Sequence, residues 1–351
     1  MQLSRRPLIQ NLQQLRIQRP SSHSRAIGLS FTGVPAPLYI PESEVREFLT
    51  YPSLIPAIRE ALIQLSAGLV SQPPRTVLRT AAGEGAHNGW FAVMPVIAGD
   101  FMAVKTVTFY PGNAELGLHT HMAVVELLRR ATGEPLALMD GRLITEMRTA
   151  SVSAVALDAL GSQNVTSLGI LGSGVQARSH LWALRHVRPA LTDIRIWSRT
   201  PENAQTLANE FGAAGSRADG AGARAVSIEE AASADVVLTA TSSTAPLLEG
   251  RWLSPNALVL AVGATGSTLR ELDDELMHAC FLVAESRTAV ERESGDVLLS
   301  GAKVQAEIGK ILANPNTAPC GKRILFKSVG LAIEDLTAAR LVWHARAKRS
   351  K

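Results

Sequence analysis

The pattern of apolar and polar positions changes character near residue 150. Before that point, short runs that alternate apolar and polar side chains are separated by turn residues, a pattern typical of strands. We expect strands over residues 38–40, 75–79, 90–96, 102–110, 122–128 and 136–139. We expect helices opening at residue 42 and over 55–65 and 145–160. The succession of short strands favours a mostly antiparallel sheet.

Beyond residue 160, strands alternate with helices. Apolar runs predict strands over residues 168–171, 193–197, 225–226, 236–240 and 258–262. Such alternation predicts an α/β fold with a central Rossmann-type, doubly wound parallel sheet. A last helix is expected from about Ala332 to Trp343.

The first of these parallel strands runs into a glycine turn, Gly172-Ser173-Gly174-Val175-Gln176-Ala177. Gly172 permits the tight turn, Gly174 lets the backbone approach a pyrophosphate, and Ala177 keeps helix and strand close. The following helix offers unpaired N–H groups to a phosphate. The segment predicts a dinucleotide site, and a glycine turn that only packs helix on strand is the alternative.

The end of the next strand bears on which dinucleotide binds. NAD sites usually carry an acid there, whereas this chain has Ser198-Arg199-Thr200. The hydroxyls can donate hydrogen bonds to a 2′-phosphate, and Arg199 can pair with it or stack on adenine. Asn203 lies one turn further along. The segment favours NADP(H), with NAD(H) possible, while a solvated surface arginine is the plainer interpretation of Arg199.

Composition narrows the partners. The 351 residues are 46% hydrophobic and 19% charged with a net charge of +4, and no basic stripe interleaved with aromatics argues for nucleic acid. No apolar run reaches the ~18 residues of a membrane span. The two cysteines, Cys280 and Cys320, form no metal motif and favour a reducing compartment such as the cytoplasm.

Residues 1–34 differ from the rest because they are rich in arginine and contain no acid. Leucines at helical spacing accompany the arginines, a composition shared by organelle transit peptides. We predict a flexible extension here, with organelle targeting as the alternative. The residues concerned are Arg5, Arg6, Arg16, Arg19, Arg25, Leu8, Leu12 and Leu15.

Three cations are candidates for binding a carboxylate. Lys105 interrupts the apolar strand FMAVKTVTFY, where a buried lysine is costly unless it meets an anion. Arg148 lies among small residues, and Arg75 follows two prolines at the start of a strand. Together they would hold a substrate carboxylate. Taken singly, each is also what an ordinary surface charge would look like.

Other candidates follow strands or lie in turns. Thr241-Ser242 and Gly263-Ala264-Thr265 end parallel strands, where ligands of such sheets bind, although ordinary strand-to-loop chemistry explains them equally well. His119 and His121 point to one face, but no third ligand accompanies them, so we expect no metal. Glu293, Asp296 and Ser328 lie in glycine turns, for which turn formation is the alternative.

The chain resembles the ornithine cyclodeaminase/mu-crystallin family over about residues 35–345. The matching segments are LALMDGRLITEMRTASVSAVA, LGILGSGVQARSH, IRIWSRT, AVGATGSTLRELDDELM, ESGDVLLSG and ILFKSVGLAIEDL. The mu-crystallin branch is nearest. The resemblance implies a homodimer in which residues 35–150 and 322–351 form an α+β substrate-binding and dimerisation domain, and residues 151–321 form the NAD(P) domain.

The resemblance also implies roles for single residues. Arg75, Lys105 and Arg148 fall at the carboxylate-binding positions, and Glu293 falls near the substrate's amino group. The implied cofactor contacts are His121, Arg148, Ser173, Val175, Gln176, Ser198, Arg199, Thr200, Asn203, Thr241, Ser242, Val262 and Ser328.

Two departures from the cyclodeaminase pattern bear on the reaction. Cyclodeaminases carry a catalytic aspartate where this chain has Thr265, and a glutamate where it has Ala92. Threonine cannot act as a carboxylate base. We therefore expect NADPH-dependent reduction of a C=N bond in a small imino carboxylate, with Lys105, Thr265 and Glu293 as catalytic candidates. Cyclodeamination or amino-acid dehydrogenation, and NADP-dependent ligand binding without catalysis, are the alternatives.

Overall fold

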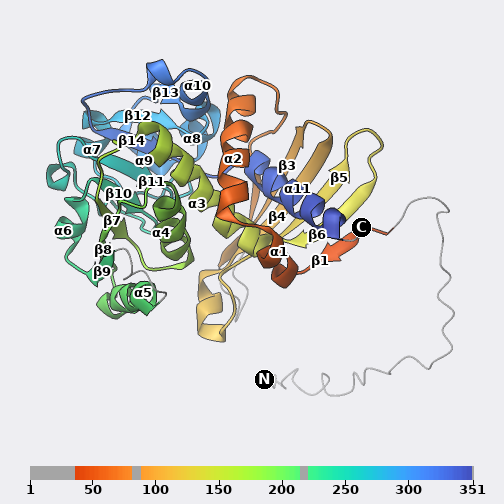
Figure 1. The fold of residues 1–351 in the computed structure, drawn as a ribbon, viewed down its shortest axis with the longest axis horizontal. Coiled ribbons are helices and arrows are strands. Elements are labelled where there is room, and N and C mark those ends of the chain that lie inside the picture. The colour runs from red at the N-terminus through yellow and green to blue at the C-terminus, as the bar shows by residue number, and fades with distance from the viewer. Residues whose placement is uncertain (1–35, 81–87, 214–219, 350–351) are drawn as a thin grey trace, which may run out of the picture. The chain divides into compact units, whose positions relative to one another are not determined.

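The computed structural model describes residues 36–80, 88–213 and 220–349, and contains two β-sheets with helices packed on them (Figure 1). The extension predicted at residues 1–34 lies outside the described residues. Among the residues that are described, no helix is both long and apolar enough to cross a membrane.

The first sheet has six strands in the order β1-β6-β5-β4-β3-β2. Neighbouring strands are antiparallel except for β1, which runs parallel to β6. The predicted mostly antiparallel sheet is therefore confirmed. The strands are β1 (Leu38–Ile40), β2 (Thr76–Thr80), β3 (Gly89–Ala98), β4 (Phe101–Phe109), β5 (His121–Arg129) and β6 (Pro135–Asp140).

Helices cover one face of this sheet. The last helix, α11 (Ala332–Arg349), lies against β3, β4 and β5, although it comes at the opposite end of the chain (Figure 1). Helices α1 (Glu42–Phe48) and α2 (Tyr51–Ser66) pack beside it. On β4, Ala103, Lys105 and Val107 point into this packed face and are buried, because alternate side chains of a strand share a face. Lys105 thus lies inside the core.

A long helix, α3 (Gly141–Leu160), begins directly after β6 and packs against helices on both sides, α2 and α4 (Val175–Val187). Its small side chains allow this close packing, as residues 149–156 are all buried. The domain boundary predicted between residues 150 and 151 falls inside this continuous helix.

The second sheet has eight strands, all parallel, in the order β13-β12-β14-β11-β10-β7-β8-β9. This confirms the Rossmann-type class. The strands are β7 (Ser167–Leu171), β8 (Asp193–Trp197), β9 (Gly222–Ala225), β10 (Val236–Thr239), β11 (Leu258–Ala261), β12 (Phe281–Ala284), β13 (Ala306–Glu307) and β14 (Ile324–Lys327). The remaining α-helices are α5 (Pro201–Ala213), α6 (Ile228–Ala232), α7 (Asp274–Ala279), α8 (Arg287–Glu293), α9 (Gly295–Ser300) and α10 (Ile308–Ala313).

Strands β12, β13 and β14 were not expected from the pattern of apolar residues. β14 pairs with β11 and β12 in the middle of its half of the sheet. A boundary at residue 322 would therefore separate β14 from its own sheet, and a boundary after Lys327 agrees better with the pairing.

The order of strands reverses between β7 and β10. From β7 the chain adds β8 and β9 on one side, and β10 is followed by β11 and β14 on the other. The carboxyl ends of β7 and β10 lie side by side, with Leu171 opposite Thr239. Ligands of open parallel sheets bind at such a switch point, so the fold places a binding crevice where the glycine turn begins.

Candidate active site

The glycine turn has the geometry that its sequence predicts. Gly172 has a φ of +126°, and a Cβ there would lie 2.5 Å from the carbonyl oxygen of Ala240. The position therefore requires glycine on two counts, conformation and space. Gly174 is different, because a Cβ added there would meet no atom within 4 Å. Its missing side chain leaves room that the protein itself does not fill.

A cleft of about 770 Å³ opens at this turn, and we call it the glycine-turn cleft. Helix α4 begins at its edge without a side-chain cap, so its first N–H groups remain available to an anion. Gln176 lines the cleft, and its Oε1 atom is buried without a hydrogen-bond partner. An uncapped helix start, an open Gly174 and an unpaired amide oxygen are features that a bound dinucleotide would complete.

The outer end of the cleft contains the segment that favours NADP(H). Ser198, Arg199, Thr200 and Asn203 all line it, and Ser198 Oγ lies 2.8 Å from Ser173 Oγ. The sole carboxylate among the described lining residues is that of Glu146, from α3. The end of β8 therefore offers hydroxyl and guanidinium donors but no acid.

At the inner end of the cleft, Thr241 is fixed by the buried carboxyl group of Glu271. Glu271 accepts hydrogen bonds from Thr241 N and Oγ1, both at 2.7 Å, and from Thr239 Oγ1 at 2.8 Å. Burial raises the pKa of this fully enclosed carboxyl group. Glu271 thus fixes the loop after β10, and with it the position of Thr241 in the cleft.

A second buried pair fixes the neighbouring loop after β11. Lys327 Nζ donates to the carbonyl of Gly263 at 3.0 Å and to Asp296 Oδ2 at 2.8 Å. The other oxygen of Asp296 accepts the backbone N–H groups of Glu271 and Leu272. Because both charged side chains are fully buried, removing either would leave an uncompensated charge. The pair therefore orders the loop that leads to Thr265.

The three predicted cations come together in the fold, two of them around Gly330. Arg75 Nη2 donates to the carbonyls of Val329 and Gly330, both at 2.6 Å. Gly330 also contacts the Arg148 guanidinium so closely that a Cβ there would lie 2.5 Å from Nη1. Lys105 is near enough that both arginines lower its pKa. These three residues were predicted from separate segments of the sequence, and the fold brings them close together.

Each of these cations faces a protein carboxylate. Arg75 Nε lies 2.7 Å from Glu293 Oε2, and Arg148 Nη1 donates to Glu334 Oε2 at 2.8 Å. Asp335 contacts two of them, as its Oδ2 lies 2.7 Å from Lys105 Nζ and its Oδ1 lies 3.3 Å from Arg148 Nε. We call Arg75, Lys105, Arg148, Glu285, Glu293, Glu334 and Asp335 the charged cluster.

Two carboxyl groups of the cluster, those of Glu285 and Glu334, lie close to each other. Glu285 accepts hydrogen bonds from Ser328 Oγ, Val329 N and Gly330 N, at 2.8, 3.2 and 2.9 Å. Burial, together with the nearby Glu285 carboxylate, raises the pKa of Glu334 well above its usual range. The raised pKa favours the protonated form of Glu334 beside Glu285.

Burial is the largest cause of the pKa shifts of Lys105 and His121. It lowers the pKa of Lys105 to about 8, although Asp335 opposes the shift. It lowers the pKa of His121 to about 4, and the neighbouring Lys105 and Arg148 act in the same direction. His121 is therefore neutral at physiological pH, where it can donate or accept one hydrogen bond in the cleft.

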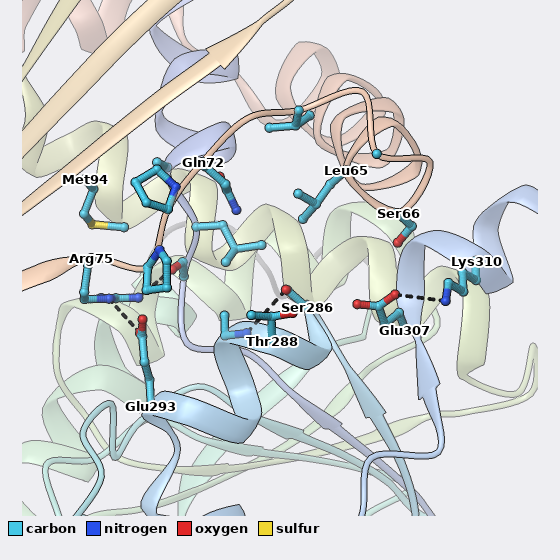
Figure 2. A pocket seen from close by; sticks show the side chains of 18 residues that line it. Leu65, Ser66, Gln72, Arg75, Met94, Ser286, Thr288, Glu293, Glu307 and Lys310 are labelled. Carbon is cyan, nitrogen blue, oxygen red and sulfur yellow. Dashed lines mark hydrogen bonds and ion pairs between the residues drawn. The ribbon is translucent and has the colours of Figure 1, made fainter.

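A smaller pocket of about 300 Å³ begins at Arg75, and we call it the Arg75 pocket. Figure 2 shows Arg75 and Glu293 facing each other at one end, below Met94, and Glu307 with Lys310 at the other. The pocket reaches from the charged cluster towards the outside between α2 and α8. It offers space beside Arg75 for a small molecule or for part of one.

Most of the predicted cofactor residues gather in one place. The glycine-turn cleft is lined by His121, Gly172, Ser173, Gly174, Val175, Gln176, Ser198, Arg199, Thr200, Asn203, Thr241 and Ser242. Four others lie outside its lining, namely Arg148, Ala177, Val262 and Ser328. Thr265 is exposed and adjoins Glu293, because Gly266 N donates to the Glu293 carbonyl at 3.0 Å.

Sequence reasoning did not find Glu285, Glu334, Asp335, Glu271 or Lys327. Glu334 and Asp335 stand in the first turn of α11, where acids are ordinary because they complement the helix dipole. Lys327 carried a usable signal, since it ends the apolar strand ILFK much as Lys105 interrupts its own strand. The described residues contain no group of three or more side chains suited to a metal ion.

Known proteins resemble this chain over nearly its whole described length. It is 42% identical over 315 residues to the ketimine reductase mu-crystallin of Mus musculus, covering 88% of this chain and 97% of that protein. The Δ1-pyrroline-2-carboxylate reductase of Thermococcus litoralis, solved with NADH and L-proline, superimposes with a TM-score of 0.82 at 33% identity, covering 89% and 98% of the two chains.

An archaeal alanine dehydrogenase dimer with bound NAD superimposes with a TM-score of 0.83 at 26% identity, covering 90% of this chain and 97% of that one. The family profile of ornithine cyclodeaminases and mu-crystallins matches residues 39–350. These matches confirm the resemblance read from the six sequence segments. The chain belongs to the ornithine cyclodeaminase/mu-crystallin family.

Proposed function

We propose that this protein is an NADPH-dependent reductase of the C=N bond in a small, cyclic imino carboxylate. The observation that carries the proposal is that Arg75, Lys105 and Arg148 come together beside the end of the glycine-turn cleft. Three cations suit a carboxylate. The mouse relative is a ketimine reductase and the Thermococcus relative is a pyrroline-2-carboxylate reductase, which supports the same chemistry.

The chain's own residues bind and align the substrate in this proposal. Arg75, Lys105 and Arg148 hold the carboxylate, and Glu293 balances the positive charge of a protonated imine. Thr265, next to Glu293 in space, offers a hydroxyl to hydrogen-bond nearby. The reduced nicotinamide, when bound, supplies the hydride. A protonated imine needs little further activation, so alignment and charge supply most of the catalysis.

The oxidative alternative has less support from the residues present. Ring closure with loss of ammonia needs an acid or base, and the positions where cyclodeaminases carry carboxylates hold Ala92 and Thr265 here. Ala92 is fully buried in β3 among apolar residues, so no substitute acid enters from that strand position. Similarity to an alanine dehydrogenase keeps amino-acid oxidation as an outcome that the assay must include.

The assay follows nicotinamide absorbance with 1-pyrroline-2-carboxylate and 1-piperideine-2-carboxylate, using NADPH and NADH in parallel. We expect NADPH to be consumed in proportion to imine. The reverse arm supplies NADP⁺ or NAD⁺ with L-ornithine, L-lysine or L-alanine and measures ammonia. Ammonia release without any imine reduction would replace the proposal by the oxidative one. Tight binding of imines with no turnover in either arm would favour a binding protein.

We also propose a homodimer built on the open face of the six-stranded sheet, within a substrate-binding and dimerisation domain. Leu78, Ile97, Met122 and Val124 lie on the face opposite α11 and are 59%, 38%, 42% and 42% exposed. An apolar sheet face of this kind suits a second copy. Sedimentation should show a dimer, and Val124→Asp should shift it towards monomer.

A further inference from the structure

The start of α11 brings one carboxylate between two of the proposed substrate-binding cations. Asp335 contacts Lys105 Nζ through Oδ2 at 2.7 Å and Arg148 Nε through Oδ1 at 3.3 Å. All three side chains are at least nine-tenths buried. Neither oxygen of Asp335 has a well-aligned hydrogen bond, so the carboxylate acts on both cations chiefly through its charge.

The arrangement exceeds what simple neutralisation of Lys105 would need. An acid on a strand next to β4 would be enough to neutralise Lys105. Here the acid comes from the last helix, and the two cations that it contacts come from β4 and α3. Lys105 Nζ also donates a long hydrogen bond to Thr145 Oγ1 at 3.5 Å, which is much weaker than its contact with Asp335. Asp335 therefore contacts both cationic groups, while Arg148 is also held by its hydrogen bond to Glu334 at 2.8 Å.

The charges around Lys105 make Asp335 decisive. Arg148 on α3, Arg75 before β2 and His121 on β5 all interact electrostatically with the ammonium group, and Asp335 on α11 is in contact with it at 2.7 Å. Both arginines and burial disfavour the charged lysine, whereas Asp335 favours it. Without Asp335, Lys105 would lose the group that keeps it protonated in this enclosed place.

We propose that Asp335 is a positioning residue, which keeps Lys105 charged and aims Lys105 and Arg148 together at the substrate carboxylate. This inference rests on the proposed function, because it concerns the same site. Asp335 does not touch the substrate in this scheme. It acts through the two cations, and the C-terminal helix thereby becomes part of the binding machinery.

A pH effect follows. The pKa of Lys105 is lowered to about 8, so carboxylate binding is present below that pH and is lost as pH rises through it. Asp335→Asn would remove the carboxylate that raises this pKa. The alkaline limb of kcat/KM should then move to lower pH by about one unit or more. KM for the imine should rise more than kcat falls, because the lost charge acts on binding.

The experiment compares Asp335→Asn, Asp335→Glu and the wild type between about pH 6 and pH 10. Asp158→Asn is the matched control, since Asp158 lies on α3 in a partly exposed ion pair with Arg59, away from the cluster. Each protein is assayed with 1-pyrroline-2-carboxylate and NADPH. Calorimetry also measures how tightly each protein binds pyrrole-2-carboxylate, a planar carboxylate. This measurement does not depend on turnover.

We expect D335N to move the alkaline limb and to weaken pyrrole-2-carboxylate binding about tenfold or more at pH 7.5. D335E should keep the limb near that of the wild type but raise KM, because its charge is retained and displaced. D158N should match the wild type in both readouts. An unchanged limb and unchanged affinity in D335N would overturn the inference.

Two further outcomes keep the inference separate from the proposed function. If the wild type reduces no imine, the proposed function fails, and the calorimetric comparison still decides whether Asp335 controls carboxylate binding. If D335N does not fold, D335E decides, because a wild-type KM in that variant would contradict a positioning role.

Discussion

The glycine-turn cleft and the charged cluster are built in opposite ways. The cleft is formed mainly by short contiguous segments, each following a parallel strand, and part of its lining is open to solvent. The charged cluster collects residues from β4, α3, α8, α11, the position before β2 and the position after β12, and five of its seven members are buried. One region is therefore local in sequence, and the other exists only in the folded chain.

The difference has a physical cause. Parallel strands bring their carboxyl ends to one edge of the sheet, so residues after successive strands meet by construction. Buried charges instead need partners wherever the fold can supply them, because an unpaired one costs several kcal/mol. Substitutions in the cleft should therefore change cofactor binding with little effect on stability, whereas substitutions in the cluster should change both.

The largest expected effect is that of Lys105→Met. Loss of a buried cation that holds the substrate should lower kcat/KM by about 10³-fold. The change also leaves buried Asp335 with only the longer, 3.3 Å contact to Arg148 Nε and should cost about 3 kcal/mol of stability. Adding Asp335→Asn should restore much of that stability without restoring activity. Denaturant unfolding and steady-state kinetics on both variants measure this, and recovered activity in the double variant would contradict our assignment of Lys105.

Gly174→Ala tests the cleft in isolation. Its backbone is ordinary and a Cβ there meets no protein atom, so stability should change by no more than about 0.5 kcal/mol. The methyl group would occupy the space in which we expect the pyrophosphate to bind. The affinity for NADPH should therefore fall about 50-fold. Gly172→Ala is the matched comparison, as strain at its positive φ should cost about 1–3 kcal/mol. Equal losses of stability in the two variants would contradict the difference expected between Gly172 and Gly174.

Arg199→Ala probes cofactor choice at the exposed end of the cleft. Loss of one charged hydrogen bond to a 2′-phosphate should raise KM for NADPH about tenfold. KM for NADH should hardly change, since that cofactor lacks the phosphate. Parallel titrations with both cofactors measure the ratio, and a similar rise for both would show that Arg199 stacks on adenine instead.

An effect confined to acid pH concerns His180, a buried residue of α4 whose hydrogen-bond partners, Ser153 and the Gln176 carbonyl, are uncharged. Its Nε2 lies 3.0 Å from Ser153 Oγ and its Nδ1 lies 2.8 Å from the Gln176 carbonyl. Burial lowers its pKa to about 4, so the unfolded state binds its proton first as pH falls below 6.5. Stability should therefore fall as pH drops from 6.5 towards 4, by about 2 kcal/mol at pH 5.

His180→Gln should remove this part of the pH dependence, because glutamine does not titrate in that range. His186→Gln, at an exposed position of the same helix, serves as the control and should keep the wild-type slope. Thermal unfolding at pH 7 and pH 5 distinguishes them. Parallel slopes for the two variants would mean that another group governs the acid limb.

Much of the fold follows from local pattern. Period-two alternation predicts β3, β4 and β5, the glycine turn marks β7 and α4, and the strand–helix alternation predicts the parallel sheet up to β11. Prediction weakens after β11, where β14 enters the sheet between β11 and β12 and the strand order no longer follows the chain. Their pairing depends on strands distant in the chain, so pattern alone could not order them.

The sequence by itself determined the dinucleotide turn, the missing acid after β8, and the presence of three cations in settings where charge is costly. Each of these depends on neighbouring residues along the chain. Only the tertiary structure decided which carboxylates face the cations, since Asp335 meets Lys105 across 230 positions of sequence. Burial makes such long-range pairing necessary, and no local pattern records which partner the fold will supply.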